Sequence, residues 1–290
     1  MLNNNNAMVT NETANTGFIL PEKVDDSFSP EDLGGDFDGI RLSLRRVKIP
    51  GGGALQFELP GDDPENPDYE RTIEGVILYN HAACAYWASG SEYDENTAPL
   101  CSSNDGRTGY GTPGGPCDIC SFNKYNTATD SKGNVTKGKA CKNMRQLYIL
   151  RSGEYMPLLL SLPPTSLRNF NDFMNLAFIN RRRPTWASVV QIGLKRVENG
   201  SNTYSIATFR KLYDFDGDQL AQIKAYATGF REQLKFTLEQ RPLFGDSVVE
   251  EDLPFDTGMD ISYNALMQDD KTPPASPYKV IDGERNELPM

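Results

Sequence analysis

Four of the five cysteines lie in one loop-like segment, at Cys101, Cys117, Cys120 and Cys141, in the pattern C-x15-C-x2-C-x20-C. The C-x2-C pair lets two thiolates converge on one ion from a tight turn, and four thiolates satisfy the tetrahedral preference of a structural zinc site. The segment is rich in Gly, Asn and Lys, so metal binding rather than apolar burial is expected to supply its folding free energy. We therefore predict a closed, structural Zn²⁺ site.

The fifth cysteine and the single histidine lie together in an apolar run outside that segment. We interpret Cys84 as a small buried apolar residue. His81 is an alternative zinc ligand in place of one thiolate. A catalytic pair of the two is disfavoured, because residues three apart in a strand point to opposite faces. The sequence contains no phosphate-binding loop and no hydrolase or metalloprotease motif, so we do not expect an enzyme.

Charge divides the chain into a basic body and two acidic arms. Residues 1–40 carry a net charge of −7 and residues 246–290 carry −8, whereas residues 96–245 carry +9. A body with this excess of cations is expected to meet an anionic partner, and acidic arms are expected to screen it or recruit other proteins. The net charge of −11 therefore does not exclude nucleic acid.

Cations and aromatic rings alternate through the basic body. Single-stranded nucleic acid requires both, because cations follow the phosphates and aromatic faces stack on unpaired bases. The candidate contacts are Arg41, Arg45, Arg46, Lys48, Tyr79, Trp87, Tyr125, Lys137, Lys139, Lys142, Arg145, Tyr148, Arg181, Arg182, Arg183, Trp186, Lys195, Arg210 and Lys211. We expect these residues to line a groove that binds without reading bases.

The elements that must position these residues are mostly strands. Alternating or continuous apolar runs predict strands over 40–48, 54–59, 71–87, 145–150, 154–162, 185–197 and 202–213. The Asn199-Gly200 pair predicts a hairpin, and apolar spacing of three to four residues predicts helices over 166–180 and 218–240. This pattern favours a mainly β (α+β) fold: an OB-like small β-barrel with an inserted zinc-binding module and two packed helices. A β-sandwich is the alternative.

The expected organisation has three parts: an acidic flexible arm over 1–38, a core over 39–245 with the zinc module at about 99–144, and an acidic flexible tail over 246–290. The tail contains Asp252, Leu253, Pro254 and Phe255, which resemble the acidic Pro-Phe tip that docks partner enzymes on bacterial single-stranded DNA-binding proteins. The sequence begins without a basic and apolar leader and has no run of 18 apolar residues. A soluble cytoplasmic protein is therefore expected.

Taken together, the cysteine module, the basic and aromatic body and the acidic C-terminus resemble the zinc-containing OB-fold single-stranded DNA-binding (helix-destabilising) proteins of tailed phages and mobile elements. The resemblance implies that the four clustered cysteines bind zinc and that the module shapes a DNA cleft. It implies single-stranded DNA as the ligand, with RNA as an alternative, and replication or recombination proteins as partners of the tail. A phage-encoded protein of this kind acts in the host cytoplasm. Two features differ: the family uses one histidine with three cysteines, and its N-terminal arm is basic.

The predicted function is therefore non-enzymatic, sequence-independent coating of single-stranded DNA in replication, recombination or repair. The alternative is a zinc-stabilised adaptor or inhibitor that meets a host polymerase or nuclease through its acidic arms.

Overall fold

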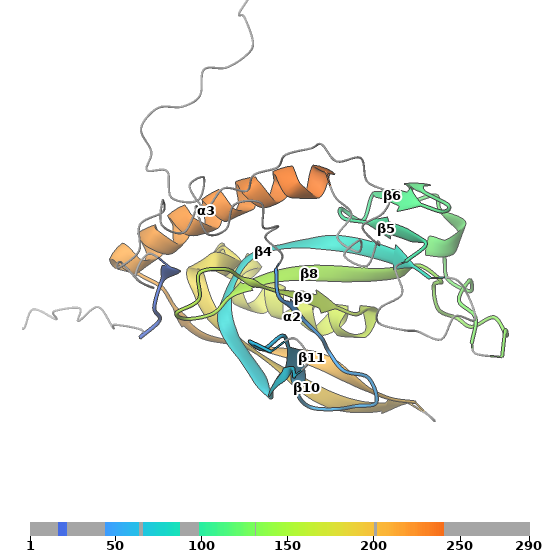
Figure 1. Cartoon of the computed structure of the whole chain (residues 1–290), viewed down its shortest axis with the longest axis horizontal. Coiled ribbons are helices and arrows are strands. Elements are labelled where there is room, and N and C mark those ends of the chain that lie inside the picture. The colour runs from blue at the N-terminus through green and yellow to red at the C-terminus, as the bar shows by residue number, and fades with distance from the viewer. Residues whose placement is uncertain are drawn as a thin grey trace, which may run out of the picture.

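Strands dominate the computed structural model, which describes residues 17–21, 44–63, 66–87, 99–130, 132–199 and 202–240 (Figure 1). The strands are β1 (Arg46–Val47), β2 (Phe57–Leu59), β3 (Asp68–Glu70), β4 (Thr72–Tyr86), β5 (Cys101–Ser103), β6 (Thr108–Gly111), β7 (Gly115–Pro116), β8 (Lys142–Leu150), β9 (Leu158–Leu162), β10 (Ser188–Asn199) and β11 (Asn202–Asp214). The α-helices are α2 (Leu167–Ala177) and α3 (Gly217–Gln240). The predicted mainly β fold with few helices is confirmed.

The long strand β4 organises the sheet. One edge pairs antiparallel with β8 between Val76 and Ala85. The other edge pairs with β10 from Thr72 to Val76 and with β5 from Cys84 to Tyr86. Strand β9 continues the sheet beyond β8, β1 pairs with it in parallel, and β11 pairs with β10 in the predicted hairpin. Among the described residues the strand pairs do not close into a barrel.

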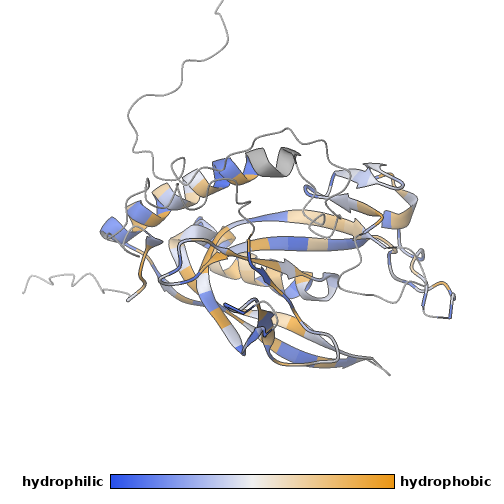
Figure 2. Cartoon of the chain, viewed as in Figure 1, coloured by the Kyte–Doolittle hydropathy of each residue, from blue (hydrophilic) through white to orange (hydrophobic). Residues whose placement is uncertain are grey.

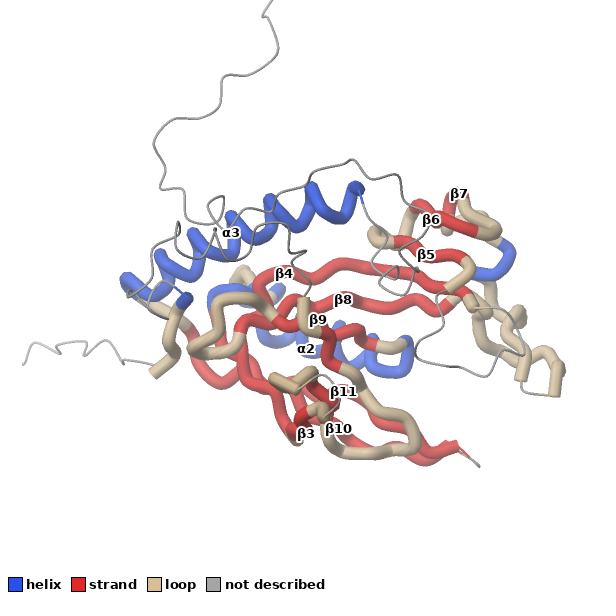
Figure 3. The backbone as a smooth tube through the Cα atoms, in the orientation of Figure 1, coloured by secondary structure: helices blue, strands red, loops and turns tan. Residues whose placement is uncertain are grey.

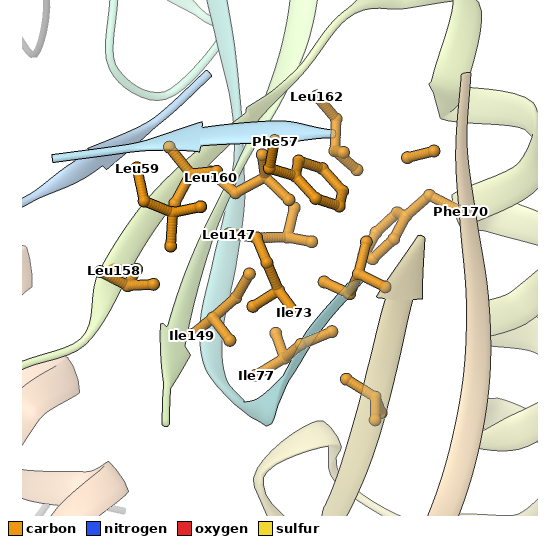
Figure 4. Packing of buried hydrophobic residues seen from close by; sticks show 14 of the residues in the cluster. Phe57, Leu59, Ile73, Ile77, Leu147, Ile149, Leu158, Leu160, Leu162 and Phe170 are labelled. Atoms are coloured by element: carbon orange, nitrogen blue, oxygen red, sulfur yellow. The ribbon is translucent and has the colours of Figure 1, made fainter. Parts of the chain in front are cut away.

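One core lies between the sheet and α2. Ile77 of β4 and Leu147 and Ile149 of β8 are fully buried there, together with Phe170 of α2 (Figure 4). Burial of each such side chain stabilises the fold by about 1.5–3 kcal/mol. Helix α2 begins after Ser166, whose hydroxyl accepts a hydrogen bond from the Ala207 amide at 2.9 Å. That bond ties the start of the helix to β11.

A second core lies on the opposite face, under α3. Val76 and Leu78 of β4 and Leu150 of β8 pack there against Ile223 and other apolar residues of the helix. Because successive residues of a strand alternate between faces, both faces of β4 are apolar at this level. Hydrophobic residues recur along this strand in the hydropathy colouring (Figure 2), and α2 and α3 lie on its two sides (Figure 3). No helix in the described part of the chain is long and apolar enough to cross a bilayer.

A short stretch of the predicted N-terminal arm belongs to this second core. Phe18 and Leu20 are buried, and Phe18 meets the Phe215 ring edge-on at 5.5 Å. The Gly153 amide donates a hydrogen bond to the Ile19 carbonyl at 3.0 Å. Residues 17–21 are therefore anchored to the body, which the prediction of a flexible arm over 1–38 did not anticipate. The acidic tail over 246–290 lies outside the described residues.

Gly75 of β4 allows β8 to approach closely, and this makes a test of the sheet. A Cβ atom at Gly75 would clash with the Leu150 carbonyl oxygen and lie 2.8 Å from Ile149 Cγ2. We expect Gly75→Ala to lower the free energy of unfolding by about 1–3 kcal/mol in urea titrations, because backbone must move. Gly51→Ala is the matched control, since its Cβ meets nothing within 4 Å. Equal stability of the two variants would contradict this description of the sheet.

Candidate metal centre and nucleic-acid interface

All five cysteines line one small cavity beside the end of β4. Its free volume is about 10 Å³ for the centre of a water-sized sphere, so it has room for a single small particle. The described residues that line it contribute five thiols, the Ser102 and Ser103 hydroxyls and the Asn123 side chain, but no carboxylate. A site dominated by thiolates and free of carboxylates is typical of zinc and other thiophilic metals.

Strand pairing brings together thiols that are far apart in the sequence. Cys101 begins β5 and pairs with Tyr86 of β4, and Cys141 directly precedes β8. Cys117 and Cys120 lie between β7 and the 3-10 helix η2 (Ser121–Asn123). The loops inserted between β4 and β8 therefore return to the same end of the sheet from which they leave.

The C-x2-C turn is fixed to that sheet by hydrogen bonds and ring stacking. The Asn123 side-chain amide donates to the Cys117 carbonyl at 2.7 Å, and the Cys141 amide donates to the Phe122 carbonyl at 2.8 Å. The Phe122 ring stacks on Tyr86 of β4 at 4.4 Å with an interplanar angle of 14°. The turn is therefore held over the cavity by groups other than its thiols.

A glycine hairpin covers the other side of the cavity. A Cβ atom at Gly109 would lie 2.9 Å from the Cys101 sulfur and 3.7 Å from the Cys117 sulfur. Both sulfurs therefore lie close to the position that a side chain at residue 109 would occupy, and only glycine, which has no Cβ atom, leaves that position free. The run of glycines in this segment thus marks close packing around the thiols.

Cys84 belongs to the cavity, and its predicted separation from the cluster is wrong. Its side chain is buried, as expected, but it lines the same space as the other four thiols. Contact with Cys141 raises the pKa of Cys84 and lowers the pKa of Cys141. Cys84 reaches the cavity because it pairs with Ser103, two residues beyond Cys101. This pairing depends on long-range strand register, which local sequence patterns do not encode.

His81 is engaged away from the cavity. Its Nδ1 lies 2.9 Å from the Ala82 carbonyl, and its Nε2 lies 3.0 Å from the Tyr148 hydroxyl. A carbonyl only accepts, so Nδ1 carries the proton and Nε2 accepts from the tyrosine. Burial lowers the pKa of His81, which favours this neutral form. Both ring nitrogens thus have partners other than a metal.

Four of the predicted nucleic-acid contacts meet on the cysteine module. Tyr125 is 73% exposed, and the Lys139 ammonium lies 5.2 Å from the centre of its ring. Lys139 also donates to the Asn123 side-chain oxygen at 3.1 Å, and Lys142 donates to the Lys139 carbonyl at 3.0 Å. Lys137 is exposed nearby in the sequence. The hydrogen bonds that order the C-x2-C turn thereby also position cations beside an open aromatic face.

A second group surrounds a pocket of about 350 Å³ at the opposite end of the sheet. Arg181, Arg182, Arg183 and Trp186 line it, together with Asp214 and the start of α3. Arg183 donates to the Ala187 and Phe215 carbonyls at 2.6 Å each and pairs with Asp214, so it is a structural residue. Arg181 and Arg182 are exposed, and Lys211 is bound to Asp214 at 2.7 Å.

Other predicted contacts are separate from these two groups. Arg45 pairs with Glu154 at 2.8 Å and Lys48 with Glu58 at 3.2 Å. Arg46 lies in β1. The cation of each pair is about half exposed, and its carboxylate is less so. Ion pairs open to solvent contribute about 0.2–1 kcal/mol each. Lys195 and Arg210 are exposed on the β10–β11 hairpin.

Four further candidates lie in or near the β4–β8 ladder. Tyr148 is fully buried, so its ring has no open face for a base. Arg145 donates to the Asn80 side chain at 2.7 Å and lies over the Phe170 ring. Tyr79 is partly buried, with the Arg231 guanidinium 5.3 Å from its ring centre. Trp87 is partly exposed just after β4. Arg41 and Asp252, Leu253, Pro254 and Phe255 lie outside the described residues.

The two basic groups lie near opposite ends of the described sheet. The arginine pocket adjoins the start of β10, where Val189 pairs with Val76, and the module adjoins Tyr86. Ten strand residues separate these positions, or about 30 Å at 3.3 Å per residue.

Comparison of the chain with protein families, with curated proteins and with solved structures finds no match. Function must therefore be inferred from the residues themselves.

The His81–Tyr148 pair gives a pH-dependent test of the site geometry. We expect the single histidine to titrate below its ordinary pKa of 6.5 in the folded protein, because burial disfavours the charged ring. Stability present above pH 6.5 is then lost as the pH falls from 6.5 through the folded pKa. Tyr148→Phe removes the donor to Nε2, which stabilises only the neutral ring, so the pKa should rise.

The measurement is an NMR titration of the one imidazole in the wild-type and Tyr148→Phe proteins. A wild-type midpoint above 6.5, or an identical midpoint in the variant, would contradict the assigned hydrogen bond.

Proposed function

We propose that this protein is a non-enzymatic, sequence-independent binder that coats single-stranded DNA. The observation that carries the proposal is that cations lie near aromatic side chains in two groups. On the cysteine module Lys139 lies over the exposed Tyr125 ring, and Arg181 and Arg182 line a pocket together with the partly buried Trp186. Cations that follow phosphates and rings that stack on bases are the two requirements for binding a single strand. A strand that spans both groups would follow β4 over about 30 Å.

The order of the elements supports an OB-like origin for the sheet. β4, β8 and β9 form an antiparallel meander, α2 follows, and β10 returns to pair with β4 before β11. An OB-fold has five strands, and its first and fourth hairpin loops bind oligonucleotides. Under this interpretation the cysteine module replaces the first of those loops, and the connection between β10 and β11 is the second. The interpretation therefore puts the module where such proteins hold their ligand.

The metal in this proposal is a structural Zn²⁺ bound by the module thiols. Cys101, Cys117, Cys120 and Cys141 all line the cavity, and soft donors there fit zinc. Among the described residues, no three His, Cys, Asp or Glu side chains are already grouped as a metal site, so binding as proposed requires the sulfurs to draw together. Zinc with four thiolates is coordinatively closed, so its contribution is folding free energy for the module.

The acidic regions have a separate role in the proposal. The tail, with its Asp252-Leu253-Pro254-Phe255 run, would compete with DNA for the cations and dock replication or recombination proteins. RNA is the alternative ligand, because stacking and phosphate contacts do not by themselves distinguish the two. The setting would be the cytoplasm of the cell in which such DNA is exposed.

Salt dependence tests the proposal. We expect the full chain to bind fluorescent oligo-dT in anisotropy titrations, with affinity that falls steeply as salt rises. Lys137→Ala with Lys142→Ala should weaken binding and reduce the slope of log affinity against log salt by about 0.7 for each phosphate that is no longer neutralised. Lys224→Ala with Lys235→Ala is the control, because it removes the same charge from exposed positions on α3.

Absence of oligo-dT binding at low salt would reject the proposed function. Equal slopes for the two double variants would instead reject the module as part of the binding surface.

A further inference from the structure

We propose that Cys84 of β4 is itself a metal ligand, so that the metal joins the cysteine module directly to the central strand of the sheet. This inference rests on the proposed structural metal site and deepens it by naming a ligand outside the inserted module. It makes the site a five-thiol centre in which four sulfurs coordinate the ion at a time.

The number of thiols around the cavity is the first argument. A structural zinc site uses four ligands, and five sulfurs line a space that holds one small particle. An inert buried cysteine is expected to sit among apolar side chains. Cys84 instead shares its cavity with four other thiols, so one of the five is in excess. A four-coordinate metal would leave one of the five thiols uncoordinated. Which thiol that is depends on where the five sulfurs lie in space, and not on the spacing of the cysteines in the sequence.

The contacts of Cys84 are the second argument. Its thiol lies 3.8 Å from the Asn143 side-chain oxygen and lines the same cavity as the Cys141 thiol. The Cys101 and Cys117 sulfurs lie 2.9 Å and 3.7 Å from the position that a Cβ atom at Gly109 would take, and Gly109 lines this cavity too. Cys84 is thus inside the connected group of sulfurs, with a polar side chain of β8 beside it. Groups that orient a ligand in this way tune metal sites from outside the coordination shell.

The position of Cys84 in the middle of the sheet is the third argument. It lies in a strand paired on both edges at this position, with Ser103 of β5 on one side and Asn143 of β8 on the other. Its sulfur is therefore the most rigidly placed of the five, because the others lie in turns or at strand ends. A metal bound to it would fix the orientation of the C-x2-C turn, and hence of Lys139 and Lys142, relative to the sheet.

The test is cadmium NMR on the full wild-type chain, with ¹¹³Cd²⁺ as the probe metal in place of zinc. Three-bond couplings between the metal and cysteine β-protons identify the ligands directly. We expect a coupling to Cys84 and to three of the other cysteines. A folded, cadmium-loaded protein with couplings to Cys101, Cys117, Cys120 and Cys141 only would overturn the inference and leave the proposed structural metal intact. Failure to bind cadmium at all would overturn both, whereas oligo-dT binding is measured separately and reports on function.

A matched pair of variants gives a second readout. Loss of a group outside the coordination shell costs about 10–100-fold in metal affinity. We expect Cys84→Ser to exceed that loss in zinc competition against a chromophoric chelator. Ser102→Ala is the control, because Ser102 is also buried and lines the same cavity without a thiol. Equal affinities of the two variants would overturn the assignment of Cys84.

Discussion

Strand β4 is hydrogen-bonded along both of its edges, and this pairing sets the positions of the other elements of the sheet. β8 follows one edge between Val76 and Ala85, while the other edge is divided between β10 and β5. This division brings both ends of the inserted segment back to one end of the strand and the arginine-rich loop to the other. Both apolar faces are covered, by α2 and by α3, so the strand has little freedom to change register.

The module at the end of β4 differs from the sheet in what can hold it together. The sheet is stabilised by two apolar cores, whereas the module has the stacked Tyr86–Phe122 pair, a few hydrogen bonds and its thiols. A metal in the cysteine cavity would therefore act as the core of the module. Because Lys139 bonds to Asn123, and Asn123 bonds to Cys117, order in the turn is linked to the position of a cation. We therefore propose that the hydrogen bonds and thiols that order the module also hold the cations that bind DNA.

Features encoded within a short stretch of sequence could be predicted, and features set by long-range register could not. Apolar spacing placed both helices, and Asn199-Gly200 placed the β10–β11 hairpin. The irregular register between Ile77 and Tyr79 changes which side chains share a face, so local alternation could not show that Tyr148 is buried beside His81. The same limit separated Cys84 from the other thiols, and Arg183 from the Phe215 carbonyl, since both placements depend on pairing across the sheet.

We propose that a metal-ordered cysteine module forms part of a surface for single-stranded DNA. The decisive measurement is the oligo-dT affinity of one zinc-loaded preparation before chelation, after chelation and after zinc is restored. We expect affinity to fall at least about tenfold when the metal leaves and to recover when zinc returns, because without the metal the cations of the module no longer share one geometry toward the phosphates. Unchanged affinity in protein that has demonstrably released its zinc would contradict it.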